Sequence, residues 1–263
     1  MLRNLLKKTG KAFYLLFTDF SEFRRRLSIF FNSPKSMKPS FFGKIVRHTA
    51  YRLTVFSEKY NTRPTKFIGN QYILKDFLDH CDKMHKPRVL ELGTKRSIPG
   101  RPTIRRGKWV LNAGEYIGSD IETGDDVDIV ADIHRLTDFV GEKQFDVIIS
   151  CATFEHLKYP HLAAHELMKV LKIGGVLFLQ THQSFPLHSY PFDYFRFSRE
   201  ALAGLFGTKM GFKVISTSYQ IPVSLYSPHA LDRDCPAFIL VQLYGEKISE
   251  TPNEYIYEFD CDL

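Results

Sequence analysis

The sequence predicts an α/β fold built on a sheet of mostly parallel strands, with helices on both faces. Two observations support this prediction. Strand-like and helix-like segments alternate from about residue 68 onward. Several of the strand-like segments are almost wholly apolar, as strands must be when helices cover both faces of their sheet. In such a sheet a ligand binds at the carboxyl ends of the strands.

The individual elements follow from periodicity and from end signals. Strands are predicted over 88–93, 115–121, 127–132, 145–150, 175–182, 213–221 and 237–245. Helices are predicted over 68–85, 162–171 and 198–206. The glycines at 174 and 175 predict the end of the middle helix, and Ser198 predicts the N-cap of the last one.

Composition bounds the class of protein. The chain has 263 residues, which suits one large domain or a domain with an extension. Apolar residues at 44% and charged residues at 25% are typical of a soluble globular protein. Four widely scattered cysteines form no CxxC pair, so neither a disulfide framework nor a structural zinc site is predicted. No apolar stretch approaches the roughly 18–20 residues that span a bilayer.

Positive charge is concentrated at the N-terminus. Residues 1–60 hold 13 Lys and Arg against 3 Asp and Glu, whereas the remainder holds 23 against 26. We interpret residues 1–60 as a basic amphipathic extension with a linker, and residues 61–263 as the main domain. An extension of this kind either docks as a helix on the domain or a partner protein, or lies on an anionic membrane surface. Because the main domain is mildly acidic, no specific nucleic-acid partner is predicted.

Four predicted strand ends bear polar residues where a ligand would lie. Glu91 and Gly93 end the first strand; a glycine lets a ligand approach the backbone closely, and an acid suits a cationic group. Asp120 ends the second strand, where a carboxylate can accept both hydroxyls of a ribose. The third strand ends at Asp132, and the fourth at the pair Ser150–Cys151.

Five stretches of the chain resemble the successive motifs of class I S-adenosylmethionine-dependent methyltransferases, especially the small-molecule branch called methyltransferase type 11. They read VLELG, YIGSDI, DIVADIHRL, FDVIISCATFEHL and HELMKVLKIGGVLFLQTH. The likeness covers roughly residues 70–220. It implies a Rossmann-like seven-stranded sheet with a reversed C-terminal β-hairpin within residues 61–263. It also implies S-adenosyl-L-methionine as cofactor, across the ends of the first, second and fourth strands.

The resemblance assigns cofactor-binding roles by position. Glu91, Gly93 and Thr94 would border the methionine part, Asp120 the ribose, and Ile121 the adenine. Asp132 and Ile133 would contact the adenine edge, and Ser150 and Cys151 would line the pocket near the sulfonium. The chain departs from the family after Gly93, where a second glycine is usual and Thr94-Lys95-Arg96-Ser97-Ile98-Pro99-Gly100 stands instead.

The segment 181–198 resembles the H-x-x-P-x-DY-x-RF stretch that closes the acceptor side in this branch. An imidazole there can take a hydroxyl proton, so His188 and, second to it, His182 are the predicted catalytic bases. Further side chains are predicted to line the acceptor pocket: His156, Tyr190, Asp193, Tyr194 and Arg196. Asp193 and Arg196 have an alternative role as an ion pair that pins the loop.

No metal site is predicted. His161 and His165 have the i,i+4 spacing of ligands on a helix, but without a matching carboxylate they are interpreted as surface or packing residues. A nicotinamide dehydrogenase is excluded because the chain lacks the GxGxxG turn that seats a pyrophosphate.

The sequence therefore favours an enzyme that transfers a methyl group from S-adenosylmethionine to an O- or N-nucleophile of a small molecule, sugar or lipid-linked glycan. The expected location is the cytoplasm, with peripheral membrane contact left open. The alternative is a catalytically silent subunit of the same fold whose basic arm recruits a partner.

Overall fold

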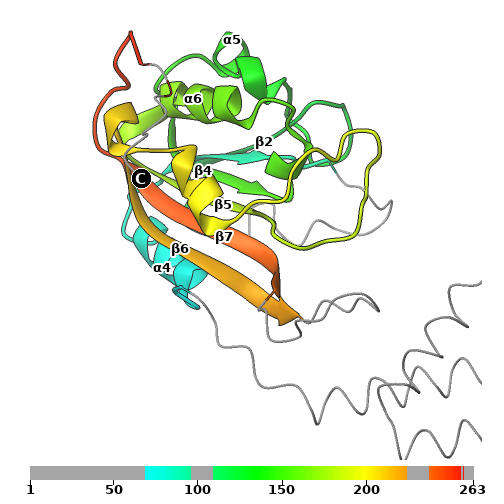
Figure 1. Cartoon of the computed structure of the whole chain (residues 1–263). Coiled ribbons are helices and arrows are strands. Elements are labelled where there is room, and N and C mark those ends of the chain that lie inside the picture. The colour runs from blue at the N-terminus through cyan, green and yellow to red at the C-terminus, as the bar shows by residue number, and fades with distance from the viewer. Residues whose placement is uncertain (1–68, 96–108, 224–236, 256, 258–263) are drawn as a thin grey trace, which may run out of the picture. The chain divides into compact units, whose positions relative to one another are not determined.

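The computed structural model describes residues 69–95, 109–223, 237–255 and 257 (Figure 1). Its strands are β1 (Arg88–Leu92), β2 (Glu115–Asp120), β3 (Ile129–Val130), β4 (Phe145–Cys151), β5 (Leu171–His182), β6 (Phe212–Val223) and β7 (Ala237–Lys247). They form one seven-stranded sheet in the order β3-β2-β1-β4-β5-β7-β6. The first five strands in this order, from β3 to β5, run parallel to one another, and β7 runs antiparallel to both β5 and β6. The predicted Rossmann-like sheet with a reversed C-terminal hairpin is confirmed.

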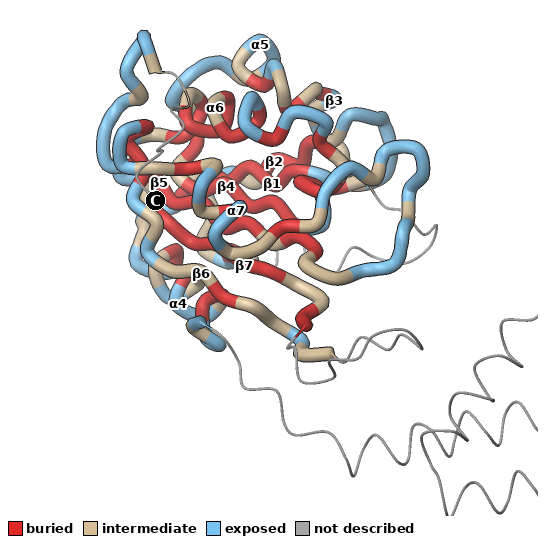
Figure 2. Tube along the Cα trace, in the orientation of Figure 1, coloured by how far each residue is buried: buried red, intermediate tan, exposed pale blue. Residues whose placement is uncertain are grey.

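Helices cover both faces of this sheet. They are α4 (Ile73–Cys81), α5 (Thr137–Val140), α6 (Pro160–Val170) and α7 (Arg199–Gly204). Side chains along β1 alternate between the two faces, so Leu90 packs in one core with Leu167 of α6, while Val89 packs in the other with Phe77 of α4. Figure 2 shows the central strands as the buried layer between these helices.

The end of α6 differs from its prediction. The helix ends at Val170, and Leu171 already has the extended backbone of β5, which therefore begins before the predicted residue 175. The glycines do not end this helix. Instead the buried ammonium of Lys247 donates to the carbonyls of Met168 (2.7 Å) and Leu171 (2.9 Å), groups that a helix end leaves without partners.

β3 is shorter than predicted because its flanking acids make other contacts. Asp128 accepts a hydrogen bond from the Gly118 amide (2.8 Å), which ties it to the neighbouring strand. Asp132 caps the 3₁₀ turn η1 (Ile133–Arg135) by accepting from the His134 amide (3.0 Å). Only Ile129 and Val130 remain to pair with β2.

Several predictions fall outside the described residues. They are the basic extension 1–60, its linker, and the part of the strand-end loop at 96–108. Within the described part of the chain, no helix combines the length and apolar character that crossing a membrane requires.

Candidate active site

The carboxyl ends of β1, β2 and β4 lie side by side. Leu92 is in register with Ser119 of β2 and with Ser150 of β4. The residues that follow these three, namely Gly93, Asp120 and Cys151, therefore leave neighbouring strands at the same edge. The structure thus brings together the strand ends from which the sequence predicted cofactor contacts.

Gly93 makes the turn at the end of β1. Its φ of +72° lies in the left-handed region, and a Cβ on it would come within 2.1 Å of Thr153 Oγ1. The amides of Gly93 and Thr94 both donate to the Ser119 carbonyl, at 2.8 and 3.2 Å. The turn at Gly93 and these two hydrogen bonds therefore hold residues 93 and 94 against the end of β2.

Asp120 faces this loop. Its carboxylate accepts from the Lys95 amide (3.0 Å) and from the Glu122 amide (3.2 Å). The ammonium of Lys95 pairs with the Glu122 carboxylate, and this hydrogen bond raises the pKa of Lys95. Glu122 therefore balances the positive charge of Lys95 beside Asp120. Ile121, the next residue, exposes 67% of its surface.

Asp132 and Ile133 occupy the next position along the edge. Asp132 Oδ1 lies 2.7 Å from His134 Nδ1 in addition to the His134 amide contact. Burial acts to raise the pKa of the Asp132 carboxyl, but the His134 contacts outweigh it and hold the pKa below its usual value. The Ile133 side chain is buried in the core, so its backbone rather than its side chain is what it can offer a ligand.

Two hydroxyls near the carboxyl ends of β2 and β4 lack hydrogen-bond partners among the described residues. The hydroxyls of Ser119 and Ser150 are buried and have no hydrogen-bond partner among the described residues. Buried hydroxyls are normally paired, so these two are available to a ligand or water at the edge. On β1, the Glu91 carboxylate accepts from the Tyr116 hydroxyl at 2.5 Å.

A second group of side chains gathers where β4 and β5 end. Glu155 lies in the 3₁₀ turn η2 (Phe154–His156), is fully buried, and accepts from Thr181 Oγ1 through Oε2 at 2.6 Å. Its Oε1 lies 2.6 Å from Nδ1 of His182, the last residue of β5. Burial acts to raise the pKa of Glu155, but the contacts from His182 and Thr181 outweigh it and lower the pKa.

The loop after β5 is pinned by an ion pair. Arg196 donates two hydrogen bonds to the Asp193 carboxylate (2.6 and 2.8 Å), and it also donates to the Phe185 and Pro186 carbonyls. Asp193 in turn accepts from the His188 amide at 3.0 Å. Of the two roles considered for Asp193 and Arg196, the loop-pinning ion pair is the one that this geometry supports.

Rings pack around the two histidines. Phe185 stacks on His182, with ring centroids 4.1 Å apart and planes at 10°. His188 contacts His156 edge-on, with centroids 4.7 Å apart. The same loop exposes four large hydrophobic side chains: Leu187, Tyr190, Phe192 and Tyr194. The predicted acceptor side therefore has a polar base and an apolar rim.

Comparison with known proteins identifies the domain. Residues 114–179, which run from just before β2 into β5, match the family model described as a methyltransferase domain. The matched residues identify a methyltransferase domain in this chain. The predictions of its family, of enzymatic activity and of S-adenosylmethionine as cofactor are confirmed. No curated protein matches the chain.

Solved structures with similar folds are distant from this methyltransferase. A 1,6-didemethyltoxoflavin-N1-methyltransferase of Burkholderia thailandensis is 14% identical, with 83% of this chain and 93% of that chain covered and a TM-score of 0.46. An S-adenosylmethionine-dependent methyltransferase of Archaeoglobus fulgidus is 15% identical, with 74% of this chain and 99% of that chain covered and a TM-score of 0.45. The YcgJ protein of Bacillus subtilis is 17% identical, with 68% of this chain and 100% of that chain covered and a TM-score of 0.44. At this level the likenesses support no conclusion about acceptor or partner.

The cofactor edge of the methyltransferase fits S-adenosylmethionine. Asp120 has two carboxylate oxygens at the edge with exposed Ile121 beside it, and Ser119 and Ser150 offer unpartnered hydroxyls. The bound cofactor would supply an activated methyl group on a sulfonium. Glu91 and Asp132 add negative charge to the same edge, which favours a cationic ligand.

Sequence reasoning missed Glu155. The motif FEHL was used to recognise the family, and a role was given to His156 but none to the glutamate before it. An acid between an apolar residue and a histidine gave no reason to expect complete burial. His161 and His165 lie away from the Glu155 group; their rings contact Tyr257 and Tyr255, as packing residues do.

Proposed function

We propose that this methyltransferase acts on an O- or N-nucleophile of a small molecule, sugar or lipid-linked glycan. The observation that carries the proposal is the buried Glu155, with His182 at 2.6 Å and His188 at 3.9 Å, at the strand edge that continues from the cofactor residues. A hydroxyl or protonated amine must lose a proton as it is methylated, and a histidine of this group can accept that proton.

The loop after β5 supports an acceptor with an apolar face. Tyr190 is 92% exposed and Leu187 is 88% exposed, and both belong to a loop whose base is fixed by Asp193 and Arg196. An aromatic rim over a polar base suits the face of a sugar ring or the start of a lipid chain. A cytoplasmic location, with contact to a membrane surface or a partner protein through residues 1–38, is part of the same proposal.

Labelled methyl transfer tests this proposal. Full-length protein is incubated with S-adenosylmethionine bearing a labelled methyl group and with aqueous and organic fractions of a cell extract. We expect label in a small molecule, oligosaccharide or lipid fraction, where mass spectrometry of the hydrolysed product distinguishes an O-methyl from an N-methyl group. Label confined to protein or nucleic acid would contradict the proposed acceptor class.

His182→Ala and His188→Ala are the matched variants. If the histidines act on the acceptor, we expect kcat to fall by about 10²–10⁴ while the affinity for S-adenosylhomocysteine stays within a few-fold of wild type. Near-normal kcat in both variants would show that the reaction depends on positioning alone. His165→Ala, on the outer part of α6, should leave both quantities unchanged.

A further inference from the structure

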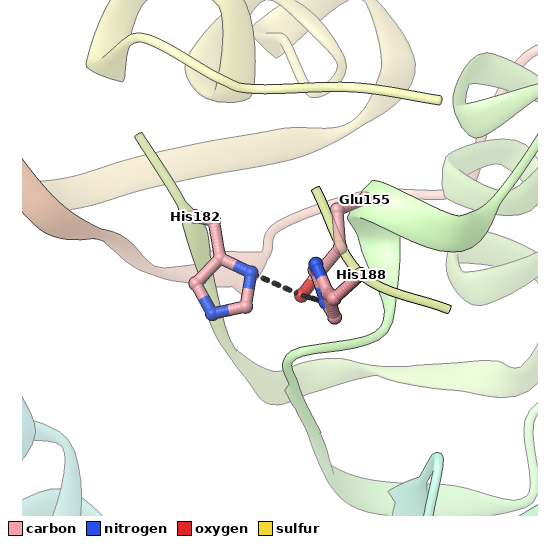
Figure 3. A group of neighbouring side chains, drawn as sticks. All are labelled: Glu155, His182 and His188. Carbon is pink, nitrogen blue, oxygen red and sulfur yellow. Dashed lines mark ion pairs between the residues drawn. The ribbon is translucent and has the colours of Figure 1, made fainter. Parts of the chain in front are cut away.

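Three imidazoles surround one buried carboxylate oxygen at the end of β5. Figure 3 shows His182 and His188 approaching Glu155 from different segments of the chain. From Glu155 Oε1 the distance is 2.6 Å to His182 Nδ1, 3.9 Å to His188 Nε2 and 3.9 Å to His156 Nε2. Glu155 is fully buried and His182 is 7% exposed. The group therefore concentrates ligand atoms in a place that water reaches poorly.

The hydrogen bonds of two rings fix where their protons lie. His156 Nδ1 is 2.7 Å from the Phe192 carbonyl, and His188 Nδ1 is 3.3 Å from the Pro186 carbonyl. A carbonyl only accepts, so each Nδ1 is the protonated nitrogen. In the neutral rings Nε2 is then a bare acceptor, and both Nε2 atoms face Glu155 Oε1. Acceptors that face one another in this way call for a positive charge between them.

The two atoms nearest the centre lack hydrogen bonds. Glu155 Oε1 and His182 Nδ1 are both buried, and neither has a hydrogen-bond partner among the described residues. They lie 2.6 Å apart and form a close charge contact with each other. The other carboxylate oxygen is held by Thr181, so Oε1 is left directed at the ring nitrogens. A buried carboxylate oxygen whose near neighbours are ring nitrogens marks a site for an ion or a water.

We propose that Glu155, His182 and His188 bind a divalent transition-metal cation. Their ligand atoms all lie within 4.8 Å of one another, which one ion can bridge with small side-chain adjustments. Two imidazoles and one carboxylate suit Zn²⁺, Mn²⁺, Fe²⁺ or Co²⁺, whereas Mg²⁺ and Ca²⁺ prefer oxygen ligands. The carbonyl that accepts from His188 Nδ1 orients that ring as outer contacts of metal ligands do.

Three protein ligands would leave positions on the ion open. An acceptor oxygen bound there would lose its proton more readily, because a cation stabilises the oxyanion. This consequence rests on the proposed function, whereas binding of the ion does not. In the metal-bound enzyme His182 and His188 would act as ligands rather than as free bases, and His156 would line the site.

The prediction of no metal site did not consider this group, and the reason is physical. It considered histidines at ligand spacing on one helix, whereas these ligands come from η2, from the end of β5 and from the loop after it. Asp193 also lies near His188 (3.5 Å from Nδ1), but Arg196 occupies both of its carboxylate oxygens. We therefore assign Asp193 to the loop and not to the ion.

Titration with Co²⁺ tests the site directly. Untagged full-length protein is stripped with EDTA, dialysed and titrated while the visible absorption of bound Co²⁺ is recorded, and Zn²⁺ competition follows. We expect about one equivalent bound per chain. Glu155→Gln and His188→Gln should each weaken Co²⁺ binding by at least about 100-fold. Because the His188 side chain lies on a loop, His188→Gln retains a testable fold if Glu155→Gln does not.

Control measurements separate this inference from the proposed function. His165→Gln should bind Co²⁺ like the wild type. If it weakened Co²⁺ binding as much as Glu155→Gln and His188→Gln do, the ion would not be bound at this group and the assignment would be overturned. S-adenosylhomocysteine binding is measured on the same stripped protein. Normal cofactor binding with no uptake of Co²⁺, Zn²⁺ or Mn²⁺ overturns the metal site alone. Full methyl transfer by the EDTA-stripped protein would overturn the role of the ion in the reaction.

Discussion

Asp120 is the residue on which cofactor affinity should depend most. Its carboxylate can make two charge-assisted hydrogen bonds to ribose hydroxyls, so Asp120→Ala should weaken S-adenosylhomocysteine binding by about 30-fold or more. Calorimetry measures the change. Because Asp120 also accepts from the amides of Lys95 and Glu122, thermal unfolding of the variant must be recorded beside it.

Glu122→Gln is the control for that experiment. It removes the ion-pair partner of Lys95 while leaving the Asp120 carboxylate in place. We expect cofactor affinity close to wild type, since the Lys95 ammonium lies on the exposed side of the loop. An unchanged dissociation constant in a folded Asp120→Ala protein would remove Asp120 from the cofactor site.

Gly93 cannot accept a side chain without strain. Its φ of +72° costs an alanine about 1–2 kcal/mol, and the added Cβ would meet Thr153 Oγ1 at 2.1 Å. Gly93→Ala should therefore lower the free energy of unfolding by more than the conformational cost and weaken cofactor binding. In a Thr153→Ala background the collision with Oγ1 is removed but the strained φ remains, so recovery should be partial.

Gly204 provides the comparison for Gly93. It ends α7, and nothing lies within 4 Å of a Cβ built on it. Gly204→Ala should leave stability unchanged or raise it by up to about 1 kcal/mol, because alanine is the better helix former. Equal destabilisation by both substitutions, measured by denaturant unfolding, would contradict the packing argument at Gly93.

At the scale of elements, Lys247 joins α6 to the C-terminal strand. Its buried ammonium donates to the Met168 and Leu171 carbonyls and to the Glu250 carboxylate. Lys247→Met keeps the apolar stem but leaves those carbonyls unpaired and buried. We expect a loss of about 2–4 kcal/mol in the free energy of unfolding, measured in urea. The affinity for the cofactor should be unchanged, because the cofactor edge lies at the other end of the strands.

Lys143 is a matched control, since its ammonium also pairs with Glu250, at 2.9 Å. That pair is exposed to solvent, and exposed pairs contribute little to stability. Lys143→Met should change the unfolding midpoint far less than Lys247→Met. Comparable losses in the two variants would assign the effect to Glu250 rather than to the end of α6.

For the molecule as a whole, the sequence predicted the sheet well because its strands are long apolar runs separated by turn residues. The strand ends that bear the predicted cofactor residues also lie together as expected, since parallel strands bring their carboxyl ends to one edge. The sequence did not predict side-chain contacts between segments that are far apart in the chain. Nothing near α6 indicates that Lys247 completes its end, and nothing in FEHL indicates that Glu155 meets His182 and His188.

The Asp193–Arg196 pair shows a different limit of the sequence. Its i,i+3 spacing is equally consistent with acceptor binding and with an ion pair that fixes the loop. Only the positions of the guanidinium and carboxylate distinguish the two roles, and both carboxylate oxygens lie within 2.8 Å of Arg196 nitrogens. A side-chain pattern on a loop predicts a role only when the backbone path is already known.

The basic N-terminal extension leads to the last prediction. The described cofactor edge is built from β1, β2 and β4 and the residues that follow them, so deletion of residues 1–38 should leave S-adenosylhomocysteine affinity unchanged. Anionic and neutral vesicles then decide between the two roles of the extension. If it lies on membranes, full-length protein should bind anionic vesicles, and deletion or about 0.5 M salt should abolish that binding. Full-length protein that ignores anionic vesicles would leave docking on the domain or on a partner protein, and a loss of cofactor affinity on deletion would place the extension at the active site.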